Sequence, residues 1–169
     1  MPSKPPGTAS RSDMYLHVQT KRAGKIKGEA VTDDHVDDIE VRSWTWGVAA
    51  STALGSGKAT ARRQYKHLVI CKGIDSASTP LLSALTTNDE VKEAKLMLRK
   101  AGGDALDYYV MTLRNARVVG VDVNVDEEGV PLESVAFSFI MIDIEYRGQQ
   151  SAGAGGGSTS FSDELLPTE

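Results

Sequence analysis

The sequence predicts a mainly β domain, an antiparallel β-barrel or two-sheet sandwich with one short flanking α-helix. Residues 118–125 carry valine at every second position, which is the strict period of a β-strand. Residues 132–146 alternate in the same way, yet both parities are apolar. Helical spacing appears at residues 78–87. Since one helix covers one flank, the doubly apolar strands must bury their second face against that helix or against other subunits.

The composition bounds the class of protein. With 169 residues, 40% hydrophobic side chains and a formal charge of −4, the chain fits one globular domain plus some tail. The lone Cys71 excludes an internal disulfide and a cysteine-based zinc cluster. No apolar run reaches the roughly 18 residues of a membrane span, so we expect no membrane insertion. The mild acidity argues against nucleic acid as the main partner.

The chain divides into three segments of different composition. Residues 1–12 are rich in Pro, Ser and Thr and lack the apolar centre of a signal peptide, which predicts a disordered extension and no cleavable signal peptide. Residues 13–148 form the predicted β domain. Residues 149–169 begin with a Gly- and Ser-rich stretch, which predicts a flexible tail. Residues 161–166 within it are assigned to a loose tail rather than to a docking segment.

The first strand is predicted at residues 14–19, and an acidic loop follows at Asp33–Asp38. Clustered carboxylates can hold calcium, but this loop lacks the glycine and the closing glutamate of an EF-hand. A solvated loop is therefore favoured over a calcium site.

The next strand holds both tryptophans, Trp44 and Trp46, on one face because they lie two residues apart. Ile39 and Val41 occupy the opposite parity, so a regular strand cannot place all four on one face. Either both faces are buried, or a bulge near Arg42 switches the register.

Residues 48–60 are rich in small side chains and predict a long flexible loop. Gly57 and Lys58 suggest a phosphate-binding loop, but Thr52 stands where its first glycine belongs and Ala59 stands where its Ser or Thr belongs. The phosphate-loop interpretation therefore fails.

The second half of the chain predicts five strands and the helix. The helix begins at a Ser or Thr cap near residue 78, with proline in its first turn, and ends near residue 87. Residues 91–100 have helical propensity but alternate in polarity before a glycine turn at 101–104, and this alternation favours a strand. The other predicted strands are 62–71, 106–113, 118–125 and 132–146.

Several of these motifs together resemble one known family. They are Asp13-Met14-Tyr15-Leu16, Lys27-Gly28-Glu29, Val41 through Trp44-Thr45-Trp46-Gly47, Ser78-Thr79-Pro80, Arg99-Lys100-Ala101-Gly102-Gly103, and Glu133-Ser134-Val135 with alternation to Glu145-Tyr146. In this order they are similar to Hcp, the haemolysin-coregulated tube protein of bacterial type VI secretion systems. The resemblance covers residues 13–148.

The resemblance implies a fold, an assembly and a set of partners. It implies a β-barrel with a flanking helix that closes into a hexameric ring, and rings that stack into the inner tube of a contractile machine. The tube carries effector proteins in its lumen and is ejected, so the protein is cytoplasmic before firing and is then secreted to the medium or a target cell. The implied partners are further rings, the spike protein at the tube tip, and sheath and baseplate components.

A sliding cargo needs a small, polar lumen wall, which predicts that Ser43 and Thr45 face the lumen. Ring stacking needs a projecting loop, for which Ala53, Leu54, Gly55, Ser56, Gly57 and Lys58 are the candidates. The predicted core side chains are Trp44, Trp46, Phe137 and Phe139. A basic patch of Arg62, Arg63 and Lys66 is interpreted as a solvated face, with pairing to a neighbour's acidic loop as the alternative.

The sequence offers no candidate catalytic, cofactor-binding or metal site. His17, His35 and His67 are far apart in the chain and lack ligand spacing. His67 and Cys71 share a strand face but lie too far apart for a nucleophile and its base. Two alternatives to the secretion tube remain: a tail-tube protein of another contractile injection system, and a stand-alone β-sandwich that binds a ligand through its long loop.

Overall fold

The computed structural model describes residues 13–51, 62–100, 106–148 and 157–165. The predicted extension at 1–12, the stacking-loop candidates at 53–58 and the glycine turn at 101–104 lie outside these ranges. The elements are β1 (Asp13–Thr20), β2 (Gly24–Ile26), β3 (Ile39–Glu40), β4 (Ser43–Thr45), β5 (Val48–Ser51), β6 (Arg62–Tyr65), β7 (Leu68–Gly73), α1 (Ser78–Thr86), β8 (Val91–Arg99), β9 (Asp107–Val125), β10 (Pro131–Ser138), β11 (Met141–Arg147) and β12 (Ser158–Glu164).

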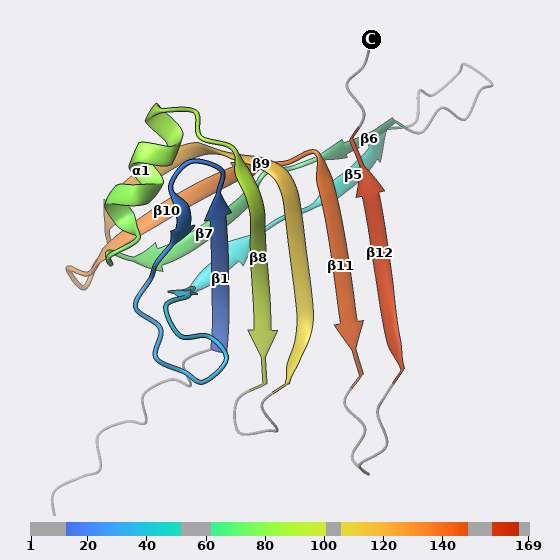
Figure 1. Ribbon diagram of the computed structural model, residues 1–169, viewed down its shortest axis with the longest axis horizontal. Helices are drawn as coiled ribbons and strands as arrows, with labels where there is room; N and C mark the ends of the chain where they lie inside the picture. Colours follow the sequence, from blue (N-terminus) through green and yellow to red (C-terminus); the bar gives the residue numbers. More distant parts are fainter. Residues whose placement is uncertain (1–12, 52–61, 101–105, 149–156, 166–169) are drawn as a thin grey trace, which may run out of the picture.

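The strands form two antiparallel sheets that share β9, as the sequence predicted for the fold class. Sheet A runs in the order β2, β1, β8, β9, β11 and β12, with β3 also paired to β1. Sheet B runs in the order β9, β10, β7 and β4. A separate ribbon consists of β5 and β6. Figure 1 shows the strands of sheet A side by side, with β7 and β10 of sheet B crossing at an angle and α1 at one end.

Strand β9 joins the sheets because it bends without ending. Its first half pairs with β8 and β11, and its second half pairs with β10. Asn115 between the halves adopts a left-handed conformation with φ of 48°, which asparagine tolerates better than most residues. Val119 is left out of the pairing with β10, which adds a bulge. The sequence predicted two strands here, and this is corrected to one bent strand.

Three predicted strands are divided in the structure. Residues 132–146 separate into β10 and β11 at Phe139–Ile140, although both pieces follow the same edge of β9. Residues 62–71 separate into β6 and β7, because β6 pairs with β5 whereas β7 pairs with β10 and β4. The tryptophan strand separates into β3, which pairs with β1, and β4, which pairs with β7. That break lies near Arg42, where a change of register was one of the two alternatives left open by the sequence.

The C-terminal segment needs a correction. Residues 158–164, assigned to a flexible tail from their composition, form β12 and pair along the whole length of β11. A neighbouring strand supplies backbone partners that satisfy the N–H and C=O groups of this polar sequence. The ordered domain therefore extends beyond residue 148.

The predicted helix and the ambiguous strand both occur. Helix α1 buries Leu81 and Ala84, and residues 91–99 form β8, as expected from their alternation. The residue that caps α1 is Ala77 rather than the predicted Ser or Thr. The Asp75 carboxylate instead accepts a hydrogen bond from the Ala77 amide at 2.9 Å.

The core lies between the sheets. Phe137 is fully buried and Phe139 is nearly so, and both belong to one cluster with side chains from sheets A and B and from α1. Trp44 and Trp46 are partly buried and pack against this cluster. Large-to-small changes in such a core cost several kcal/mol, so this cluster carries much of the domain's stability.

Candidate functional site

The outer face of sheet B is made of small and mostly uncharged side chains. Strand pairing aligns its outward residues in three rows across β4, β7, β10 and β9. The rows are Ser43, Cys71, Ser134 and Asp122; Thr45, Val69, Ala136 and Gly120; and Gly73, Leu132 and Asn124. Every one of these residues is at least partly exposed. Ser43 and Thr45 therefore belong to a continuous small-residue face that we call the smooth face.

Two charges border the smooth face at its opposite edges. Asp122 ends a row on β9 and is exposed. Arg42 lies beside β4, where its guanidinium approaches the outward side of Gly73, with Nη2 3.8 Å from the position a β-carbon would take. Among the residues that the structure describes, neither side chain has an ion-pair partner.

The charges of β7 and β10 point inward instead. Lys72 is completely buried, and its Nζ lies 2.6 Å from Glu133 Oε2 and 2.8 Å from Asp75 Oδ1. Ser78 of α1 completes this group by donating to Glu133 at 3.0 Å. Sequence reasoning missed the cluster. The alternation of the strand could have predicted it, because residue 72 has the same parity as the buried positions 68 and 70 and so faces inward.

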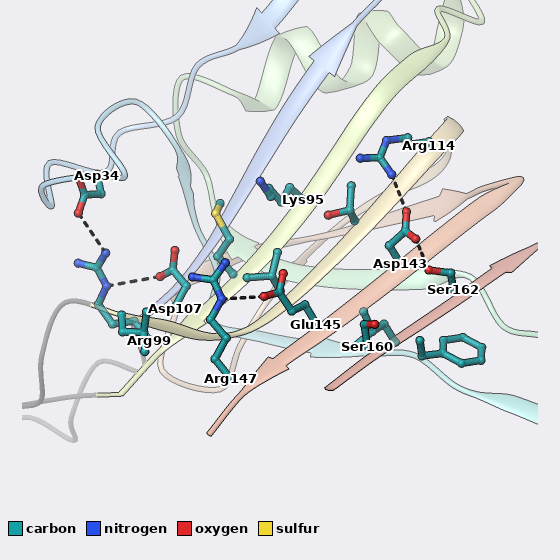
Figure 2. Close-up of a pocket in the computed structure, with 16 residues that line it drawn as sticks. Asp34, Lys95, Arg99, Asp107, Arg114, Asp143, Glu145, Arg147, Ser160 and Ser162 are labelled. Carbon is teal, nitrogen blue, oxygen red and sulfur yellow. Dashed lines mark hydrogen bonds and ion pairs between the residues drawn. The ribbon is translucent and has the colours of Figure 1, made fainter. Parts of the chain in front are cut away.

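The outer face of sheet A carries a charged groove of about 690 Å³ between β8, β9, β11 and β12. Figure 2 shows that most of its charges pair with one another, whereas Lys95 has no dashed line to a partner. Arg114 lies 2.5 Å from Asp143, and Arg147 lies 2.8 Å from Glu145. The charges of this groove are therefore largely neutralised within the chain.

A second polar cluster holds the acidic loop against sheet A. His35 is buried, and its two ring nitrogens lie 3.1 Å from Asp38 and 2.9 Å from Asp107. His17 lies 3.2 Å and Lys25 lies 3.3 Å from the same Asp38 carboxylate. Two of the three histidines expected to be far apart, His17 and His35, are thus joined through one aspartate. Asp38 is buried, so the prediction of a fully solvated acidic loop is wrong at this residue.

The environment of Asp38 changes its pKa. Burial raises the pKa of this carboxyl, but hydrogen bonds from His17 and His35 and the charge of Lys25 outweigh burial. The net effect lowers the pKa below its ordinary value of 3.8. The ionised form is therefore the one that the fold stabilises.

One residue of the predicted basic patch, Arg63, forms an ion pair within the chain. Arg63 of β6 donates to Asp163 of β12 at 2.5 Å and 3.1 Å, and the Tyr65 hydroxyl donates to the same carboxylate at 2.5 Å. These bonds, the tyrosine's first, lower the pKa of Asp163. They tie the ribbon of β5 and β6 to the C-terminal strand. The sequence missed this contact because residue 163 was assigned to a loose tail.

Two further kinds of site are absent from the described ranges. No group of three or more His, Cys, Asp or Glu residues within them could hold a metal ion. Within the same ranges, no helix is long and apolar enough to cross a membrane.

Comparison with known proteins gives consistent matches. Residues 15–146 match the family described as "Type VI secretion system effector, Hcp". The chain is 29% identical over 146 residues to "Protein hcp1" of Pseudomonas aeruginosa, a match that covers 84% of this chain and 87% of that protein. It is 28% identical over 118 residues to the "Major exported protein" of the same organism, with coverage of 63% and 69%.

Solved structures agree with these matches. A type VI secretion system effector from Yersinia pestis superposes with a TM-score of 0.72 at 25% identity, covering 90% of this chain and 100% of that one. Hcp1 from Escherichia coli EAEC 042, in a mutant form, superposes with a TM-score of 0.73 at 25% identity, covering 90% and 99%.

Proposed function

Because this chain belongs to the Hcp family of type VI secretion proteins, we propose that it is a structural subunit of the secretion tube. Hexameric rings of the chain stack into a tube that carries effector proteins in its lumen and is ejected with them. The observation that carries this proposal is the smooth face, which is four strands wide. A wall of small, mostly uncharged side chains lets a protein cargo move without strong adhesion.

The edges of sheet B support ring closure. In the described residues, β4 pairs with β7 alone, and β9 beyond residue 116 pairs with β10 alone. Exposed valines accompany the β9 edge, namely Val119, Val123 and Val125. An unpaired, apolar edge favours contact with another chain. A head-to-tail contact between the β9 edge and the β4 edge, repeated six times, closes sheet B into one wall.

The closed wall would place the two outer faces on opposite sides. The smooth face would line the lumen, with Ser43 and Thr45 in it, and the groove of sheet A would face outward toward the sheath. The groove's internally paired charges suit a tube that must slide past its sheath. Spike and baseplate components are the other proposed partners, and the stacking loop at 53–58 stays a prediction from sequence. The exported relative supports release from the cell after firing.

The first test is the mass of the purified protein by size-exclusion chromatography with light scattering. A mass of six chains supports the ring. A monomer at high concentration and moderate salt contradicts it and favours a stand-alone binding module.

The second test separates the two faces with one matched substitution. Ser134→Arg adds a long cation to the smooth face, and Ser160→Arg adds the same side chain to the outer face of β12. Both variants should keep the ring mass. Co-purification of an effector should fall with Ser134→Arg and stay at the wild-type level with Ser160→Arg. An equal response of the two variants would contradict the lumen assignment.

A further inference from the structure

Some charged side chains of the described ranges have an ion-pair partner within the chain, and others have none. On sheet A, Arg114 and Arg147 are paired, and the inward-facing Lys72 has two carboxylates. Asp122 and Arg42 are among the charged residues that have no ion-pair partner in the described ranges. They have opposite charges and border the same face.

The two side chains cannot reach each other within one chain. Asp122 is on β9 and Arg42 adjoins β4, at opposite edges of a sheet with β10 and β7 between. Three strand spacings of about 4.8 Å separate the backbones of β9 and β4 by roughly 14 Å, and no ion pair joins Asp122 and Arg42 within the described chain. An ion pair between these residues therefore requires a second copy of the chain.

The backbone holds Arg42 beside β4 with its guanidinium turned back toward β7, so a pair across the seam needs the side chain to swing outward. The Arg42 amide donates to the Cys71 carbonyl at 2.8 Å, and its guanidinium lies on the outward side of Gly73. The neighbouring residue Ser43 begins the row that Asp122 ends.

We propose that Asp122 of one copy and Arg42 of the next copy form an ion pair across each seam of the ring. The inference rests on the proposed ring, because the β9 edge and the β4 edge meet in that assembly alone. Directly opposed residues on paired strands have β-carbons about 5 Å apart, and the arginine side chain spans a register offset of a residue. The exposed Val123 next to Asp122 points to the other face of sheet B and would also be covered at the seam.

The pair also gives the contact a direction. Each copy offers an anion at one edge and a cation at the other, so contact between two β9 edges or two β4 edges would oppose like charges. Like-charge contacts disfavour wrong pairings, and only the head-to-tail order closes a ring. The seam pair thus selects the geometry that the smooth face needs.

The test is a charge exchange measured by light scattering. Asp122→Arg and Arg42→Glu should each shift the ring toward monomer at a concentration where the wild type is assembled, and the double variant should restore the ring mass. Asp143→Arg with Arg114→Glu, on sheet A, is the matched control and should leave the mass unchanged. Single variants that stay fully assembled at low salt would overturn the pair.

A cross-linking experiment guards against misfolding of the charge variants. In a Cys71→Ser background, Arg42→Cys with Asp122→Cys should form covalent multimers up to the ring with a short bis-maleimide, whose reach matches that of the arginine side chain, whereas either cysteine alone should give no ladder on a denaturing gel. Intact rings without a ladder would overturn the seam pair and leave the tube proposal standing. If neither the wild type nor the Cys71→Ser protein forms a ring, the tube proposal itself is contradicted.

Discussion

The two sheets place their charges on opposite sides. On β11 of sheet A, Ile142 points into the core while Asp143 and Glu145 point outward. On β7 and β10 of sheet B, Lys72 and Glu133 point inward, while Cys71 and Ser134 lie on the outer face. Sheet A follows the ordinary pattern of a soluble protein. Sheet B reverses it beside α1.

Burying the charges of sheet B costs hydration free energy. This cost indicates that the outer face of sheet B is under a separate requirement. A buried ion pair must recover the loss of hydration of two charges, and an apolar pair of similar shape is often as stable. Solubility alone would place the charges of β7 and β10 outside. Their inward position is consistent with an outer face that has to stay small and weakly charged, which is the requirement of a lumen wall.

Disrupting the buried cluster of Lys72, Glu133 and Asp75 should lower the free energy of unfolding the most. Lys72→Ala leaves Glu133 buried without its cation, and we expect the free energy of unfolding to fall by about 3–5 kcal/mol. Urea denaturation followed by circular dichroism measures this change. Lys72→Met combined with Glu133→Leu is the control, because it removes both charges and should recover most of the stability. Equal losses in the two variants would show that packing, not charge pairing, matters at this site.

Substitution of the buried Asp38, which lies beside sheet A, should lower the free energy of unfolding by an intermediate amount. Asp38→Asn weakens the hydrogen bonds from His17 and His35, and we expect a loss of about 1–3 kcal/mol at neutral pH. The folded protein lowers the pKa of Asp38 below 3.8, whereas the unfolded chain has a value of about 3.9. Its contribution is therefore present above pH 4 and is lost as the pH falls through the folded pKa.

Thermal unfolding from pH 6 to pH 3 tests this pH dependence. Asp38→Asn should flatten the loss of stability toward acid relative to the wild type. Asp33→Asn, in an exposed position of the same loop, should keep the wild-type profile. If both variants follow the wild type, another group controls the acid response.

The exposed pair on sheet A should have the smallest effect. Arg114→Ala removes an ion pair whose side chains are each about two-fifths exposed, and we expect a cost of at most about 1 kcal/mol. Added salt should narrow the difference from the wild type further. A loss as large as that of Lys72→Ala would remove the distinction between the two sheets.

The sequence predicted the local features well. The alternation at 118–125, the strand at 91–99 and the helix at 78–86 all occur in the structure, and the ordered motifs identified the family. Ser43 and Thr45 were recognised as small residues opposite the tryptophans, and they do lie on an exposed face. The continuation of that face across three further strands was not predicted, because it depends on which strands pair.

Periodicity and the order of motifs are properties of neighbouring residues, so the sequence by itself determined the fold class, most elements and the family. The tertiary structure decided which strands share an edge, and with it three results. It joined β9 across both sheets, recruited residues 158–164 as β12, and turned Lys72 and Glu133 toward each other. Each depends on backbone and charge partners that lie tens of residues away in the chain. A local pattern shows that a strand alternates, whereas only the assembled sheets show which side is covered.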